Sequence, residues 1–321
     1  MRDFFKDGTV LELSEKSDGS QLQKYRIISV ADEGGSAVCY DAVCEDTGKT
    51  GKLKEFYPLG YNLYRYAEND WHLTAGAGVI RNFESICQQY IEPYRQINSV
   101  MGENQILKNY IQDSTVLYSA PLKDMPSTVY IWTVGFAGDK LSDYFEKLLE
   151  EPQNDADQKL YDILKAVQTI TSGISALHCA GLMHLDIKPD NFLIHYDGMG
   201  NCNPSTISMF DIDTFYFFEQ TIPKGLGTPA YRAPELSSGR ADNQSDIYSI
   251  GALLLSAIVG KDDFAKCVER RYERGFVDNT LRHTSLIQEL TYGNSSTVIS
   301  RISDILRKCL ARNKKERYTG C

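Results

Sequence analysis

The stretch that decides the fold of this chain is HLDIKPDN, residues 184–191. It follows an apolar run with helical spacing, and it places Asp186, Lys188 and Asn191 at offsets of 0, +2 and +5. These residues supply a carboxylate, an ammonium group and a carboxamide within one short loop. Such a loop can accept a proton, offset negative charge and hold a metal ion, which are the elements of a catalytic site.

Four further segments lie downstream of this loop. FDID at 210–213 is an apolar residue leading into an acidic turn. GTPAYRAPE at 227–235 and SDIYSIG at 245–251 come next, and ARNKKER at 311–317 lies near the last residue. A resemblance carried by one such short segment would be weak evidence, but several segments in a fixed order form a strong signal.

The five segments resemble, in the same order, those of eukaryotic-like (Hanks-type) serine/threonine protein kinases. The resemblance implies that Asp186 is the catalytic base and that Lys188 offsets charge on the transferred phosphoryl group. It also implies that Asn191 and Asp211 bind Mg²⁺ or Mn²⁺ together with ATP. Two residues depart from the family pattern, since Ile212 and Asp213 stand where Phe and Gly are usual.

The same resemblance assigns structural roles in the second half of the chain. Thr228 would hydrogen-bond the catalytic Asp and Lys, and Asp246 would hold the backbone of the catalytic loop. Glu235 and Arg317 would form an ion pair behind the activation segment. The expected fold is α+β and two-lobed, with a small β-rich lobe followed by a larger helical lobe.

Composition is typical of a globular protein. The 321 residues are 42% apolar and 24% charged, with a net charge of −9, which argues against a general nucleic-acid binder. The longest apolar run, residues 250–260, is about half of the ~20 residues that a membrane span needs and is better interpreted as a buried helix. No signal peptide is recognisable at the N-terminus. The eight cysteines are scattered without metal-ligand spacing, which favours reduced thiols and a cytoplasmic protein.

The residue pattern changes from strand-like to helical near residue 135. Strand-like segments lie at 25–30, 37–43, 52–56 and 127–134. Helical patterns follow the last of them, at 141–149 and at 162–178, where Gly181 stops the second; an earlier helical pattern at 80–101 contains Pro93, which would kink or end it.

We therefore expect residues 1–321 to form a single protein kinase domain. Residues 1–134 would be an N-lobe with a five-stranded antiparallel sheet plus helix C, and residues 135–321 would be a helical C-lobe. The native protein is also expected to be able to continue past residue 321 with additional domains.

The nucleotide-binding residues of the N-lobe are harder to place. The glycine loop corresponds to DEGGSAVCY at 32–40, where Gly34 falls on a family glycine, Gly35 adds backbone freedom and Cys39 replaces the usual Val. A plain hairpin turn explains this segment equally well.

The lysine that would contact the phosphates is Lys54 or Lys52. Because side chains alternate along a strand, both lysines lie on the same face. We prefer Lys54, because KEFYP at 54–58 resembles bacterial eukaryotic-like kinases and Lys52 is nearer a polar turn.

Two further features of the nucleotide site depend on the resemblance. The helix C glutamate that pairs with the lysine would be Glu84, with Glu92 as the alternative. The hinge would follow the strand at 129–134, with Thr133 as gatekeeper and the backbone of Val134 and of Phe136 facing adenine. An ordinary core strand ending in a turn explains the hinge residues as well.

Regulation is suggested by Leu185, which stands where an Arg often receives an activation-loop phosphate. Leu cannot form that contact, so the catalytic loop is of the non-Arg-Asp type. Thr214 and Thr221 are the hydroxyls available for phosphorylation in the segment, and we expect activity that does not depend on them. Lys188 and Thr228 favour a serine/threonine kinase over a tyrosine kinase.

These residues are compatible with three functions. The first is an ATP- and Mg²⁺-dependent kinase acting on Ser/Thr of protein substrates, with no nucleic-acid partner and no membrane span. The second is a pseudokinase that serves as a nucleotide-binding or scaffold module, favoured by the poor glycine loop. The third, phosphorylation of a small molecule, is opposed by the Ala-Pro-Glu segment, which builds a platform for protein substrates.

Overall fold

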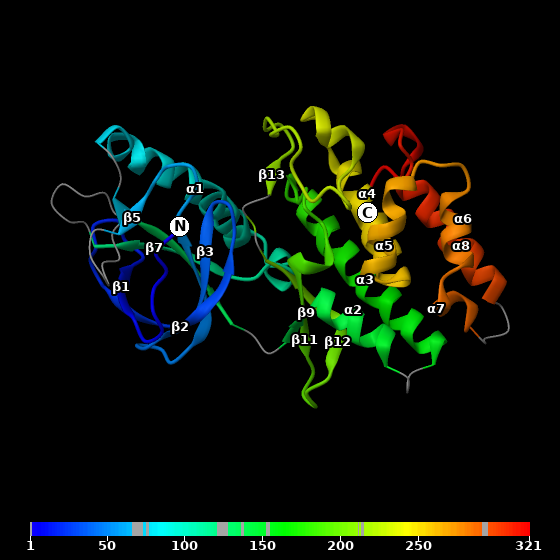
Figure 1. Ribbon diagram of the computed structural model, residues 1–321, viewed down its shortest axis with the longest axis horizontal. Coiled ribbons are helices and arrows are strands. Elements are labelled where there is room, and N and C mark those ends of the chain that lie inside the picture. Colours follow the sequence, from blue (N-terminus) through cyan, green and yellow to red (C-terminus); the bar gives the residue numbers. More distant parts are fainter. Residues whose placement is uncertain are drawn as a thin grey trace. The chain divides into compact units, whose positions relative to one another are not determined.

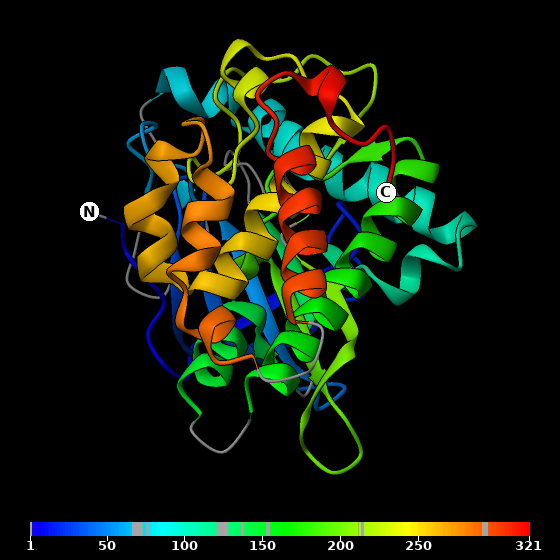
Figure 2. The same cartoon turned by 90° about the vertical axis from the view of Figure 1, so that its right-hand side faces the viewer.

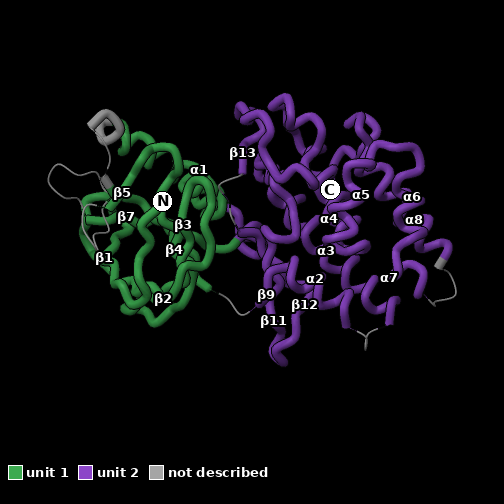
Figure 3. The backbone as a smooth tube through the Cα atoms, viewed as in Figure 1, with its two compact units in different colours: residues 1–103, 112–136 green, residues 104–111, 137–321 purple. Residues whose placement is uncertain are grey.

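The computed structural model describes most of the chain. The described residues are 2–65, 73–74, 77–120, 128–135, 138–151, 155–210, 212, 215–290 and 295–321. They form two compact units (Figure 3). Unit 1 contains residues 1–103 and 112–136, and unit 2 contains residues 104–111 and 137–321. The division after residue 136 lies close to the expected lobe boundary, although residues 104–111 belong to unit 2.

Unit 1 is built on a closed antiparallel barrel in the strand order β1-β2-β3-β4-β8-β7 (Figure 1). The strands are β1 (Val10–Ser14), β2 (Gln23–Glu33), β3 (Ala37–Cys44), β4 (Thr50–Phe56), β7 (Ser114–Ser119) and β8 (Val129–Val134). The expectation of a five-stranded sheet was wrong, because β1 pairs with both β2 and β7. Leu11 and Leu13 of β1 are fully buried, so burial of their side chains accounts for the sixth strand.

Helix α1 (Ala77–Glu103) is the long helix of unit 1. It continues through Pro93, so the proline does not end the helix, which was one of the two effects expected from the sequence. Phe56 at the end of β4 stacks on Tyr90 of α1, with ring centroids 4.3 Å apart. This contact packs α1 against the barrel. A short β5 (Tyr64–Arg65) and β6 (Leu73–Thr74) pair between β4 and α1.

Unit 2 is mainly helical, as expected. Its helices are α2 (Leu141–Glu150), α3 (Ala156–Cys179), α4 (Asn243–Val259), α5 (Lys261–Cys267), α6 (Phe276–Arg282), α7 (Ser285–Gln288) and α8 (Ser295–Cys309). Helix α3 begins at the Asp155 cap, whose side chain accepts a hydrogen bond from the Gln158 amide. The chain turns away from α3 at Gly181, which has a φ of +80°. The sequence therefore predicted this helix and its stop, but the helix begins at Ala156, before the expected start at residue 162.

Helix α4 carries the apolar run that the sequence predicted to be buried. Its residues from Ser245 to Ile258 are all buried. Contacts with α3, α5, α7 and α8 surround it, and Figure 2 shows the outer helices of unit 2 facing the viewer. Among the described residues, no helix has the length and apolar character needed to cross a membrane. The expected buried helix is confirmed.

Short strands connect the helices of unit 2. β9 (Gly138–Lys140), β11 (Phe192–Tyr196) and β12 (Cys202–Met209) form one sheet, and β10 (Leu182–Met183) pairs with β13 (Tyr216–Phe217). The loop between β10 and β11 is the HLDIKPDN segment and includes the single 3₁₀ turn η2 (Pro189–Asn191). The candidate catalytic residues are thus held between two short strands.

Candidate active site

Helix α4 anchors the backbone of the catalytic loop. The fully buried carboxylate of Asp246 accepts hydrogen bonds from the backbone amides of His184 and Leu185, each at 2.8 Å. The imidazole Nε2 of His178 on α3 lies 2.9 Å from the same carboxylate. Leu185 is held at a φ of +62°, a left-handed conformation that costs a non-glycine residue roughly 1 kcal/mol. The charged hydrogen bonds to Asp246 stabilise this conformation.

Asp186 follows directly and is oriented through both of its carboxylate oxygens. Oδ1 accepts from the backbone amide and from the hydroxyl of Thr228, each at 2.7 Å. Oδ2 lies 3.0 Å from Nδ2 of Asn191 and 3.3 Å from Nζ of Lys188. Burial alone would raise the pKa of Asp186, but the Thr228 hydrogen bonds and the charge of Lys188 outweigh burial, so its pKa is lowered. The carboxylate is therefore ionised near neutral pH.

Lys188 and Thr228 complete this polar network. The Lys188 ammonium donates to the Thr228 hydroxyl at 3.0 Å. Residue 228 can approach the loop because Gly227, with a φ of +85°, precedes it. A side-chain Cβ at Gly227 would lie 2.5 Å from the Leu185 carbonyl oxygen, which is too close for any other residue. The activation segment and the catalytic loop therefore meet backbone to backbone.

Asn191 is oriented so that its amide oxygen is available to a metal ion. Its Nδ2 donates to the Asp186 carbonyl at 2.8 Å and to the Asp186 carboxylate at 3.0 Å. With the nitrogen used in this way, Oδ1 is turned from Asp186, and a carboxamide oxygen is a suitable ligand for Mg²⁺. The backbone amide of Phe210 bonds the Asn191 carbonyl at 3.2 Å, which brings the next segment alongside. Asp211, Asp213 and Thr214 lie outside the described residues.

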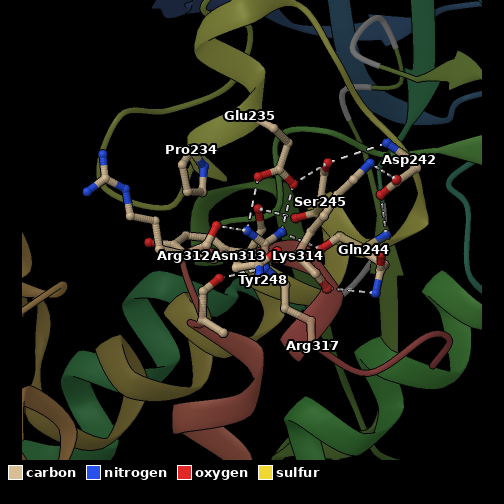
Figure 4. Close-up of polar contacts among 12 residues, drawn as sticks. Pro234, Glu235, Asp242, Gln244, Ser245, Tyr248, Arg312, Asn313, Lys314 and Arg317 are labelled. Carbon is tan, nitrogen blue, oxygen red and sulfur yellow. Dashed lines mark hydrogen bonds and ion pairs between the residues drawn. The ribbon is translucent and has the colours of Figure 1, made fainter.

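The Ala-Pro-Glu segment is tied to the end of the chain by a buried ion pair (Figure 4). Arg317 donates to both carboxylate oxygens of Glu235, at 2.7 and 3.0 Å, and its side chain is fully buried. Ser245 donates to the same carboxylate at 2.8 Å. Burial would raise the pKa of Glu235, but the Arg317 and Ser245 hydrogen bonds lower it overall. The ion pair expected between these residues is formed.

The lysine candidates of unit 1 differ in their surroundings. Lys52 is exposed and pairs with Asp41 at 2.6 Å. Lys54 is half-buried and lies in register with Cys39 on β3 and Ile131 on β8. Because Lys52 is exposed whereas Lys54 is half-buried, the arrangement favours Lys54 for the nucleotide.

The helix C glutamate is the expectation that the structure does not reproduce. Glu84 and Glu92 are both exposed on α1, and within the described part of unit 1 neither forms an ion pair with Lys54. The buried carboxylate of unit 1 is instead Glu55, the neighbour of Lys54, whose Oε2 lies 2.6 Å from the Arg65 guanidinium. Glu55 and Arg65 were missed, because nothing in the local pattern distinguishes a buried Glu from a solvated one.

The hinge candidates are only partly described. Thr133 is half-buried and its hydroxyl lies 3.0 Å from that of Ser114. The Val134 carbonyl accepts from the side-chain amide (Nε2) of Gln112 at 2.9 Å. Phe136 lies outside the described residues. The hairpin turn with Gly34 and Gly35 connects β2 and β3, as the sequence indicated.

Comparison with known proteins settles the family. The model of the protein kinase domain matches residues 85–321. The chain belongs to this family. The kinase domain is similar to calcium-dependent protein kinase 25 of Arabidopsis thaliana, with 24% identity over 275 residues, which are 85% of this chain and 50% of that protein. It is also similar to ribosomal protein S6 kinase alpha-6 of Danio rerio, with 30% identity over 225 residues, 68% of this chain and 28% of that protein.

A third relative, calcium-dependent protein kinase 27 of rice (Oryza sativa subsp. japonica), is 27% identical over 276 residues, 85% of this chain and 42% of that protein. The chain spans half or less of the length of these curated relatives. The family match includes the catalytic loop, the activation segment and Arg317 but begins after the glycine loop and Lys54. The family assignment and the two-lobed fold predicted from the sequence are confirmed.

His178 is a residue of the kinase domain that sequence reasoning overlooked. It occupies the last turn of α3, where a histidine usually interacts with the helix dipole and with water. Its contact with Asp246 joins two residues that lie 68 positions apart in the chain, so only the folded structure reveals it.

Proposed function

We propose that this kinase domain transfers the γ-phosphoryl group of ATP to serine or threonine hydroxyls of proteins. The observation that carries the proposal is the fixed, ionised carboxylate of Asp186, held by Thr228, Lys188 and Asn191. Phosphoryl transfer depends mainly on positioning and electrostatic stabilisation, and this network supplies both.

In this reaction the substrate hydroxyl oxygen attacks the γ-phosphorus, the bond to the bridging oxygen breaks, and ADP leaves. Asp186 orients the hydroxyl and receives its proton. Its lowered pKa makes it a weak base, which suits a transition state in which the proton moves late. Lys188 lies beside it and offsets charge on the transferred group.

ATP and a divalent metal ion are the expected cofactors, with Mg²⁺ preferred over Mn²⁺. The Asn191 amide oxygen and the Asp211 carboxylate would hold the metal, which draws charge from the phosphate oxygens when bound. In unit 1, we assign Lys54 to the phosphates and Thr133, Val134 and Phe136 to the adenine side, with Cys39 on the face that carries Lys54.

Serine/threonine specificity is supported by the contact between Lys188 and Thr228. The names of the relatives, which include calcium-dependent protein kinases and a ribosomal protein S6 kinase, are in keeping with a protein substrate. The substrates of this chain, any further domains and its expected place in the cytoplasm stay predictions.

A second function, that of a pseudokinase, is favoured by one observation. Glu84 is exposed, whereas an active kinase needs a glutamate paired with the strand lysine. A chain that binds Mg·ATP without transferring phosphate would establish this alternative.

The test is an assay with radiolabelled ATP, Mg²⁺ and a generic protein substrate, followed by phosphoamino-acid analysis. We expect phosphoserine or phosphothreonine from the wild type and none from Asp186→Ala. Asp304→Ala, which removes an exposed aspartate from α8, is the matched control and should retain activity. Phosphotyrosine, or transfer that persists in Asp186→Ala, would contradict the proposal.

A further inference from the structure

The N-terminal residues are built into the turn between β2 and β3. The guanidinium of Arg2 donates to the carbonyls of Gly34 at 2.6 Å and Gly35 at 2.8 Å, and it pairs with Glu33 at 3.2 Å. The Arg2 side chain is only 3% exposed. These three acceptors replace water around the two terminal nitrogens of the buried guanidinium, whereas among the described residues Nε has no hydrogen-bond partner.

Further contacts hold the N-terminal segment in place. Nε of Arg65 donates to the Asp3 carbonyl at 2.8 Å, and the Arg65 guanidinium lies 3.6 Å from the centre of the Phe5 ring. The same Arg65 is ion-paired to Glu55 on β4. Arg2 is thus positioned by a segment that is itself anchored inside unit 1.

The turn is also held on its carbonyl side by the residues that follow β4. The Leu59 amide donates to the Gly35 carbonyl at 2.9 Å, and the Tyr57 amide donates to the Ser36 carbonyl at 3.1 Å. In a trans peptide, the carbonyl of one residue and the amide of the next point in opposite directions. Because Arg2 holds the carbonyls of Gly34 and Gly35, the amides of Gly35 and Ser36 point away from it.

These two amides are available to a ligand. Within the described residues, neither the Gly35 nor the Ser36 amide donates a hydrogen bond. A Cβ added at Gly35 would meet nothing within 4 Å, and one added at Gly34 would meet only the Ala37 oxygen at 3.7 Å. Neither glycine has a positive φ, so this fold does not itself require them. Successive amides directed to one open side form an anion-binding concavity.

We propose that Arg2 is a positioning residue that fixes the Gly34–Ser36 turn so that its two free amides receive the phosphates of the nucleotide. The inference rests on the proposed function, since that function makes the anion a nucleotide phosphate. A glycine loop with few glycines is thereby held in one conformation by an arginine outside it. The turn therefore loses its conformational entropy when the chain folds and not when the nucleotide binds.

The experiment measures binding of Mg·ATP and of adenosine to the full chain by titration calorimetry. In Arg2→Ala we expect the Kd for Mg·ATP to rise about 10-fold, the factor that corresponds to ordering roughly one backbone residue. Adenosine, which lacks phosphates, should bind unchanged. Arg2→Lys should give an intermediate Kd, because an ammonium group cannot bond both carbonyls in one fixed plane.

The matched control is Arg26→Ala, which removes an arginine that lies on β2 and pairs with Glu45 at 2.8 Å. The Arg26 side chain is 52% exposed, and its loss should alter neither affinity. An unchanged Mg·ATP affinity in Arg2→Ala would overturn the proposal. Equal weakening of ATP and adenosine would overturn it as well, because that result indicates a general structural role.

Hydrogen exchange of the wild type and Arg2→Ala without nucleotide gives a second readout. We expect faster exchange of the Gly34 amide, which bonds the Ala37 carbonyl at 3.0 Å across the turn, and unchanged exchange in β7 and β8. If the wild type binds neither ATP nor adenosine, the proposed function fails. Hydrogen exchange alone then tests whether Arg2 fixes the conformation of the Gly34–Ser36 turn. Unchanged exchange at the turn would then overturn it.

Discussion

The catalytic loop of unit 2 and the nucleotide side of unit 1 follow different designs. In unit 2, Asp186, Lys188 and Asn191 lie within one loop and contact one another directly. In unit 1, the glutamate expected to pair with Lys54 is exposed, and the β2–β3 turn is held by Arg2 from outside the hairpin. Chemistry confined to one loop leaves a recognisable sequence pattern, whereas nucleotide positioning can be achieved by residues far apart in the chain.

The largest effect is expected at Asp186, which carries the unit 2 side of this comparison. Asp186→Asn should lower kcat by about 10²–10⁴-fold with little change in ATP affinity, because the amide can neither accept the proton nor balance the charge of Lys188. Initial rates and calorimetric ATP titration measure the two quantities. Asp304→Asn on α8 is the control. A variant with wild-type kcat would remove Asp186 from the catalytic role.

Thr228 should have the next largest effect. Thr228→Ala removes the hydroxyl that donates to Asp186 and accepts from Lys188, and a hydrogen bond to a charged group is worth about 1.5–3 kcal/mol. We expect kcat to fall about 10- to 100-fold. Thr228→Ser keeps the hydroxyl and should recover most of the rate. If the Ser variant is as slow as the Ala variant, the hydroxyl is not the reason.

Glu235→Gln should act on stability and on its pH dependence. It leaves the fully buried Arg317 side chain without its anion, which typically costs about 3 kcal/mol or more. Because the folded-state pKa of Glu235 lies below the ordinary value of 4.5 for a glutamate, the ion pair stabilises the fold above pH 4.5, and this stabilisation is lost as the pH falls through the lowered pKa.

Urea unfolding at neutral pH and at pH 4 and below measures this change. The deficit of Glu235→Gln should be large at neutral pH and should shrink in acid. Glu146→Gln is a matched control, since Glu146 pairs with Lys261 at 3.4 Å and is 48% exposed. A deficit of equal size in Glu146→Gln would show that burial of the Glu235 pair does not matter.

A small effect is expected from the hydroxyls of the activation segment. The double variant Thr214→Ala, Thr221→Ala should stay within a few-fold of wild-type activity, because Leu185 provides no cation for a phosphate and is itself 1% exposed. Initial rates before and after phosphatase treatment test this. Loss of activity in either experiment would show that another basic residue receives a phosphate.

The smallest effect is expected at Glu84. In the described arrangement Glu84 is exposed and forms no ion pair with Lys54, so Glu84→Gln should change kcat/KM by less than about twofold. Glu92→Gln is the companion variant. A loss of 10-fold or more in Glu84→Gln alone would mean that α1 brings Glu84 to Lys54 when nucleotide binds, and the contrast between the two units would narrow.

The sequence was sufficient wherever neighbouring residues act together. The loop at residues 184–191 and the buried helix α4 were predicted because their spacing is local. The contact between Glu235 and Arg317, 82 residues apart, came from the family resemblance and not from residue spacing.

The sequence was insufficient where strand pairing or the burial of a residue depends on another residue far away in the chain. Leu11 and Leu13 alternate as a strand does, but the pairing partner of β1 in β7 lies about a hundred residues away and carries no matching signal. The burial of Glu55 depends on Arg65 and that of Arg2 on Gly34 and Gly35. Tertiary contacts of this kind outweigh the usual preference of charged residues for the surface.

Closure of the barrel by β1 has a consequence for how the kinase domain behaves in concentrated solution. An open sheet ending in β2 and β7 would present two rows of unpaired backbone groups, which are templates for strand addition by another molecule. β1 covers both edges at once, through Val10–Leu13 on β2 and through Leu13 and Ser14 on β7. Removing residues 1–14 would therefore do more than shorten the chain, because it would expose two adhesive edges and favour self-association.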